Sequence, residues 1–146
     1  MTVTFRNVEA SPDDPVATWP YEAIATVLER GLVTDWQPLF AEVRREPWGP
    51  VARRIERVLA RDPIPGVSAL FLRAISSARR NAETAEREEV ADRVALAIRD
   101  SGLPAVRFAE LVGTSASRLS TYASGRVTPS AAMLLRIERS GRSRWR

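Results

Sequence analysis

The sequence predicts an all-α protein, and three observations point to this fold class. Apolar residues recur every three or four positions in several stretches, which places them on one face of a helix. Proline and glycine separate these stretches. The one long stretch without large apolar residues, 79–89, consists mostly of strong helix formers. A chain of 146 residues with 45% apolar content is long enough to bury a core.

The N-terminal part begins without a helical pattern. Residues 11–15, Ser-Pro-Asp-Asp-Pro, have loop composition, and residues 2–8 are either a short extended segment or a disordered arm. A helical pattern starts at Pro20, with Thr18 as its expected cap and Gly31 as its expected end. The first helix is therefore expected between Pro20 and Gly31.

Two further helices are expected before the next break. One starts after Thr34 or Asp35 and ends before Pro47, and the next begins at Pro50, because proline is favoured in the first turn of a helix. Residues 62–66, Asp-Pro-Ile-Pro-Gly, then end the pattern. The residues expected to face inward are Ile24, Val27, Leu28, Trp36, Leu39, Phe40, Val43, Val51, Ile55, Val58 and Leu59.

A long helical stretch follows, from about Val67 to Ser101. Apolar residues line one side of its first part at Val67, Leu70, Phe71, Ala74, Ile75 and Ala78, and the stripe resumes at Val90, Val94, Ala97 and Ile98. Between these parts, acidic and arginine residues stand four positions apart, a spacing that favours helix. One continuous helix explains the pattern, and a break near Asn81 is the alternative.

The chain is thus expected to have an N-terminal helical region over 1–78, a helical linker over 79–87 and a C-terminal domain over 88–146. Charge follows a similar division. Residues 1–100 carry 14 arginines against 16 acidic residues, whereas residues 101–146 carry 8 arginines against 2 acidic residues. The C-terminal segment therefore has the basic excess that binding to nucleic-acid phosphates requires.

Composition also limits the chemistry. The chain has no cysteine and no histidine, and all 22 of its basic residues are arginine. Disulfides, thiol nucleophiles and the usual zinc ligands are thus excluded. We expect a protein that is not an enzyme, with no catalytic residue, no metal site and no cofactor. No membrane span and no leader segment are indicated, so a cytoplasmic location is expected.

The most specific pattern lies in the last third of the chain. With Ala105 as the first position of a short helix, the small residue Ala109 falls at the fifth, Gly113 at the ninth and Leu119 at the fifteenth. This spacing is typical of two short helices joined by a tight glycine turn, the unit that places its second helix in the DNA major groove. Further residues expected to face inward are Phe108, Val112 and Tyr122.

These residues resemble the Cro and phage-repressor type of helix-turn-helix protein, the XRE family, over residues 88–140. The match extends past the turn to residues 125–130, Gly-Arg-Val-Thr-Pro-Ser. The next helix also matches, at Met133, Leu134 and Ile137. The resemblance implies a lambda-repressor-like domain. Many members place glutamines where this chain has Ala105 and Ala116, and often glutamate at Ala123, so no relative's target sequence can be transferred.

The resemblance implies that residues 115–124 form the recognition helix, with Ser115 as its cap and double-stranded DNA as partner. The residues expected to contact DNA are Ser115, Ala116, Ser117, Arg118, Thr121, Arg126 and Thr128. Arg118 is the first candidate for reading a base, because arginine can hold guanine O6 and N7 together. Arg126 is expected on a phosphate, and Ser117 and Thr121 could reach either.

The expected function is a sequence-specific transcriptional regulator, a repressor acting as a homodimer. The alternative is an antitoxin-like protein whose N-terminal region binds a partner toxin while the C-terminal unit represses their operon. Aromatic residues of the N-terminal region motivate the alternative, since they are either core or an interface for dimerisation or a protein partner. They are Trp19, Tyr21, Trp36, Phe40 and Trp48. A third reading makes the C-terminal unit a protein-binding module, because fold alone does not imply function.

Overall fold

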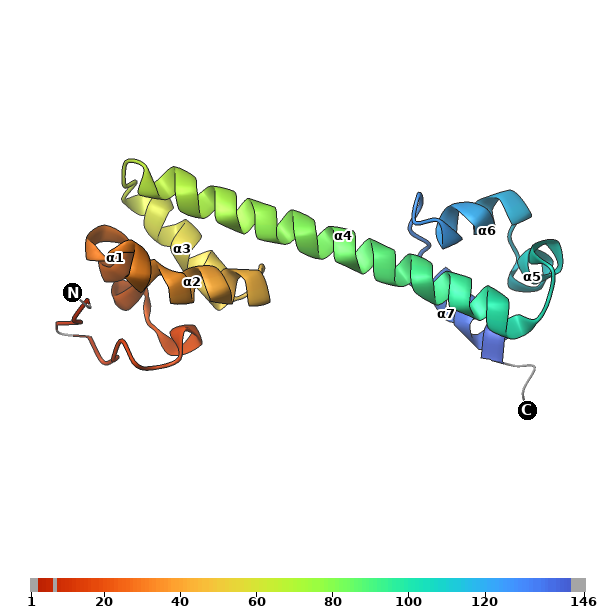
Figure 1. Cartoon of the computed structure of the whole chain (residues 1–146), viewed down its shortest axis with the longest axis horizontal. Coiled ribbons are helices and arrows are strands. Elements are labelled where there is room, and N and C mark those ends of the chain that lie inside the picture. The colour runs from red at the N-terminus through yellow and green to blue at the C-terminus, as the bar shows by residue number, and fades with distance from the viewer. Residues whose placement is uncertain (1–2, 7, 143–146) are drawn as a thin grey trace. The chain divides into compact units, whose positions relative to one another are not determined.

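The computed structural model describes residues 3–6 and 8–142, and this part of the chain contains helices and no strand (Figure 1). The predicted all-α fold class is confirmed. The elements are η1 (Val16–Thr18), α1 (Tyr21–Arg30), α2 (Val33–Arg45), α3 (Pro50–Arg61), α4 (Val67–Ser101), α5 (Ala105–Val112), α6 (Ala116–Ala123) and α7 (Ala131–Arg142). Residues 1–82 form one compact unit, unit 1, and residues 83–146 form a second, unit 2. The boundary between them falls inside 79–87.

The start of unit 1 differs from the prediction at the first helix. Thr18 does not cap α1; it ends η1, and its hydroxyl donates to the carbonyl oxygen of Pro15 at 2.7 Å. Pro20 precedes α1 instead, with no side-chain cap. Residues 3–6 are neither helix nor strand, and Phe5 packs edge-on against Trp19 with ring centroids 5.2 Å apart. The N-terminal segment is therefore part of the unit 1 packing.

Local signals set the starts of α2 and α3. The carboxylate of Asp35 accepts the backbone N–H of Leu32 at 2.8 Å, so α2 begins at Val33, slightly earlier than predicted. Helix α3 begins at Pro50 as predicted, since a proline there loses no helical hydrogen bond. Both helices end at the breaks that the sequence indicates, before Pro47 and at Asp62.

Aromatic rings close the core of unit 1. Phe71 of α4 is fully buried; it stacks on Phe40 at a centroid distance of 4.5 Å and meets Trp36 edge-on at 5.7 Å. One expectation is wrong here, because Leu70 is 46% exposed rather than inward. Trp48 is 45% exposed, which agrees with the interface alternative for the aromatic residues of this region and not with a place in the core. Unit 1 therefore presents apolar side chains to its surroundings.

Helix α4 runs without a break through Asn81, so the alternative of a broken helix is wrong. Its first part buries Phe71, Ile75 and Ala78 in unit 1, and its last part buries Ala91, Val94 and Ala97 in unit 2. Residues 83–89 are all exposed. Because no side chain of this stretch is buried, its helicity depends on local propensity and on the packed turns that flank it.

Helix α7 lies so close to α4 that only glycine fits at the contact. A Cβ added at Gly141 would stand 2.8 Å from the carbonyl oxygen of Ala97 and 3.0 Å from its Cβ. Gly141 is buried, and α7 continues to Arg142. Residues 141 and 142 therefore belong to the packed helix, and residues 143–146 lie outside the described residues.

Substituting Gly141→Ala tests this contact. Glycine in a helix is less favourable than alanine by about 1 kcal/mol, so propensity alone predicts stabilisation. We expect instead a loss of about 1–3 kcal/mol in the free energy of unfolding, because the added methyl overpacks the contact. Urea unfolding followed by circular dichroism measures the difference. Arg139→Ala, an exposed change on the same helix, is the control, and a more stable Gly141→Ala variant contradicts the packing described here.

Candidate nucleic-acid interface

A left-handed turn joins α5 to α6. Gly113 has φ +79°, a conformation that glycine adopts at little cost. The N–H of Thr114 donates back to the carbonyl oxygen of Ala109 at 2.9 Å, which satisfies a carbonyl at the helix end. Ala109 itself is 1% exposed. The ninth-position glycine and the fifth-position alanine thus have the conformation and the burial that their spacing predicts.

The next three residues fix where α6 begins and which side it buries. Ser115 caps the helix, and its hydroxyl oxygen accepts the N–H of Arg118 at 3.1 Å. Leu119 and Tyr122 face the core of unit 2 at 1% and 6% exposure. The predicted inward positions of α5 and α7 are buried with them at Phe108, Val112 and Ile137. The opposite side of α6 is left towards solvent.

The solvent side of α6 holds some of the predicted DNA-contacting residues and not others. Ser115, Ser117 and Arg118 are exposed. Ala116 is half-buried because it packs against the core cluster, so it offers less surface than the other three. Thr121 is also half-buried, and its hydroxyl donates to the carbonyl oxygen of Arg118 at 2.6 Å. The accessible polar groups therefore concentrate in the first turn of α6.

The loop after α6 brings a second group of predicted residues to the surface. Gly125 has φ +77°, and a Cβ there would meet the Cβ of Ala91 on α4 at 3.4 Å. The N–H of Val127 donates to the carbonyl oxygen of Thr121 at 3.1 Å, which ties the loop to α6. Arg126 and Thr128 are both exposed. Ser130 then accepts the N–H of Met133 at 3.1 Å and so caps α7.

Thr128 does not lie in basic surroundings. It lines a hollow on unit 2 together with Glu83, Glu86, Arg87 and Val90 of α4. Carboxylates beside a phosphate raise the cost of binding it, because like charges repel over a distance of about 10 Å at ordinary salt. The loop therefore has a basic end at Arg126 and a partly acidic end at Thr128.

Several arginines of unit 2 form ion pairs with carboxylates, which neutralise part of the positive charge of its surface. Arg107 pairs with Glu110 at 3.3 Å, and Arg93 with Glu138 at 2.6 Å. No carboxylate of the described residues pairs with Arg118 or Arg126. Counted by the structural division, unit 1 has 11 arginines and 10 acidic residues, and unit 2 has 11 and 8. Unit 2 as a whole therefore has a small basic excess, and the larger excess lies in the segment after α4.

Two supporting contacts escaped prediction. Arg136 of α7 donates from Nη1 to the carbonyl oxygen of Val112 at 3.1 Å, where a cation also faces the negative end of α5. No pattern in the sequence predicts a contact between Arg136 and Val112, which are 24 residues apart. The Tyr122 hydroxyl accepts Nε–H of Arg118 at 3.1 Å, and their four-residue spacing on one helix could have indicated that contact.

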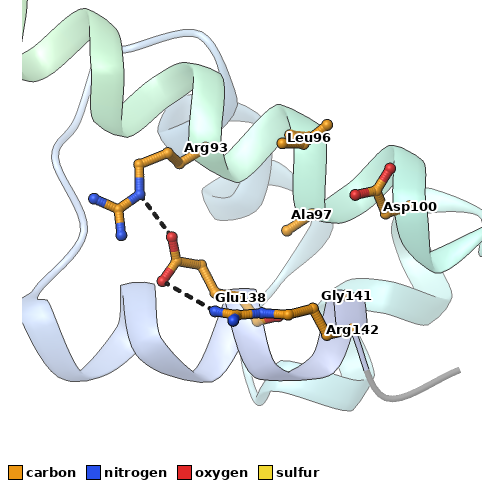
Figure 2. A pocket seen from close by; sticks show the side chains of 7 residues that line it. All are labelled: Arg93, Leu96, Ala97, Asp100, Glu138, Gly141 and Arg142. Carbon is orange, nitrogen blue, oxygen red and sulfur yellow. Dashed lines mark hydrogen bonds and ion pairs between the residues drawn. The ribbon is translucent and has the colours of Figure 1, made fainter. Parts of the chain in front are cut away.

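A small pocket of about 200 Å³ lies between α4 and α7 (Figure 2). Figure 2 shows Glu138 between two arginines: it accepts from Arg93 Nε at 2.6 Å and pairs with Arg142 Nη2 at 3.9 Å. The hydrogen bond from Arg93 holds the pKa of the Glu138 carboxyl below its ordinary value, and the charges of both arginines act in the same direction. The two arginines thus bind Glu138 at this rim, and the Arg93 pair joins α4 to α7.

The described part of the chain contains no helix that is both long and apolar enough to cross a membrane. Within residues 3–6 and 8–142, acidic side chains form no cluster of three that could hold a metal ion. No family model, no curated protein and no solved structure matches the chain.

Acidification tests the role of Glu138. Since its pKa is lowered in the folded state, its contribution to stability is complete above the ordinary glutamate pKa and is lost as the pH falls through the folded value. Between about pH 7 and about pH 3, wild type should lose more free energy of unfolding than Glu138→Gln does. Glu9→Gln, an exposed change, should follow wild type. If wild type and Glu138→Gln lose the same free energy of unfolding over this pH range, the ion pair between Arg93 and Glu138 does not contribute to stability.

Proposed function

We propose that this chain is a sequence-specific DNA-binding protein, a transcriptional repressor that inserts α6 into the major groove. The observation that carries the proposal is the turn at Gly113: Ala109 and Leu119 on its two sides are buried, and the first turn of α6 presents Arg118 to solvent. A helix presented in this way, with an arginine that pairs with no carboxylate of the described residues, matches the chemistry of base edges in the major groove. The resemblance to the XRE family supports the same function.

The proposal gives different roles to the two arginines of the site. Arg118, on the first turn of α6, reads a base. Arg126, in the loop that follows α6, contacts a phosphate. Ser115 and Ser117 add short polar groups beside Arg118, and the backbone N–H groups at the start of α6 favour a nearby phosphate.

We also propose that the protein binds as a homodimer. One α6 reaches only a few base pairs, and a single module of this kind buries a modest surface. Two copies that read half-sites about 34 Å apart would provide both affinity and specificity. A binding site selected from random DNA should then be an inverted repeat with half-sites about one helical turn apart.

A second candidate is an antitoxin-like protein, in which unit 1 binds a toxin and unit 2 represses the operon that encodes both. The exposed Leu32, Val33 and Trp48 of unit 1 favour it, because apolar side chains of this size are common at protein interfaces. Co-expression with the product of the neighbouring gene discriminates. This candidate is supported if the product inhibits growth when expressed alone and the two proteins form a stable complex that relieves the inhibition. A homodimer that does not bind the product counts against it.

Alanine substitutions separate base reading from phosphate contact. Arg118→Ala should lose about 1–3 kcal/mol of discrimination at one base pair of the selected site. Arg126→Ala should weaken binding to all sequences alike and lower the slope of log K against log salt by about 1. Fluorescence anisotropy with matched and single-mismatch duplexes measures both. Arg61→Ala removes an equal charge from unit 1 and should change neither quantity; equal effects of all three variants contradict the site.

Neutralising the acidic residues beside the loop should strengthen binding. Glu83→Gln with Glu86→Gln removes two negative charges near Thr128, so we expect several-fold tighter binding at low salt, with the gain shrinking as salt screens it. The double variant Glu22→Gln, Glu29→Gln changes the same charge in unit 1 and is the control. If the two double variants bind equally well, Thr128 does not lie near DNA.

A further inference from the structure

Arg118 is held at three points on α6. Its N–H donates to the Ser115 hydroxyl at 3.1 Å, its carbonyl oxygen accepts from the Thr121 hydroxyl at 2.6 Å, and its Nε–H donates to the Tyr122 hydroxyl at 3.1 Å. The first two bonds fix the backbone. The third fixes the side chain, although Arg118 is exposed. The side chain that reaches towards DNA is thus tied to its own helix.

The acceptor in the third bond is rigid. Tyr122 is 6% exposed, and its ring belongs to the core cluster with Phe108, Leu119 and Ile137. A packed ring has only two side-chain torsions, so the position of its hydroxyl is set by the core. An arginine side chain otherwise carries about 2 kcal/mol of rotamer entropy, part of which is lost when it binds. Tyr122 removes some of that freedom before any ligand arrives.

The bond also decides which donors remain. Arginine has five N–H groups. With Nε–H on Tyr122, the pair Nη1 and Nη2 is left to bind a ligand end-on, and the side-on approach through Nε is blocked. A guanine edge offers two acceptors, O6 and N7, that one guanidinium can hold together.

We infer that Tyr122 is a positioning residue for base recognition: its hydroxyl orients the Arg118 guanidinium so that Nη1 and Nη2 read a guanine end-on. The inference rests on the proposed function and adds to it. Tyr122 touches no DNA, and it acts by reducing the cost of ordering Arg118. A bond that served only to satisfy the tyrosine hydroxyl would affect stability and leave specificity unchanged.

Tyr122→Phe tests the inference, because it removes the hydroxyl and keeps the ring. In anisotropy measurements on a duplex selected by the wild type, we expect about 3- to 10-fold weaker binding and reduced preference for one G·C pair. In the Arg118→Ala background, the same substitution should have no effect on binding. Tyr21→Phe removes a tyrosine hydroxyl from unit 1 and should bind as wild type does.

A second measurement needs no DNA. By NMR, the Nε–H of Arg118 should be more ordered and exchange more slowly with water than the Nε–H of Arg126, and Tyr122→Phe should abolish the difference. Equal order and exchange at the two arginines of the wild type would overturn the inference. Thermal unfolding confirms that the variant is folded.

The outcomes separate the two proposals. Wild type that prefers no sequence overturns the proposed function, and this inference with it. Wild type that is specific, with Tyr122→Phe equally specific, overturns only the inference. An equal loss of affinity from Tyr122→Phe in the wild-type and Arg118→Ala backgrounds also overturns it, because Tyr122 would then act through the fold.

Discussion

The left-handed backbone at Gly113 is the constraint on which the proposed interface depends. It turns the chain within three residues, so that α6 packs on α5 and one core cluster buries both Ala109 and Leu119. Any other side chain at this position would be strained, because φ is +79°. The exposure of Arg118 and the burial of Tyr122 both follow from the direction that this turn gives to α6. A different turn would point α6 in another direction, and Arg118 and Tyr122 would lose this arrangement.

Helix α7 supports the turn from behind. Through Arg136 it binds the last carbonyl of α5, and through Gly141 it lies against Ala97 of α4. The Glu138 pair with Arg93 adds a charged contact at the same junction. One helix thus connects the end of α5 to α4, so the rigidity of the surface on α6 depends on residues that need not touch DNA.

Local chemistry made much of this predictable. Proline at the start of α3 and glycine after α5 act on their own neighbours, and the periodic apolar residues needed no knowledge of the fold. The contacts of Arg136 and Gly141 were not predictable, since each depends on a helix distant in sequence. Whether Trp48 is core or surface stayed open for the same reason, because the sequence does not say which aromatic residues pack in the core. The acidic neighbours of Thr128 were not predictable either, because they belong to α4, which is distant from that loop in sequence.

The most direct test of a DNA-reading surface on α6 is an NMR titration of the isotope-labelled full chain with a duplex that the protein itself selects from random DNA. The selection should enrich one motif, and the largest chemical-shift changes should fall within residues 115–128, led by the side chain of Arg118. A DNA-reading surface on α6 is contradicted if no motif is enriched, or if the changes cluster on the surface of α1 to α3 and leave α6 unaffected.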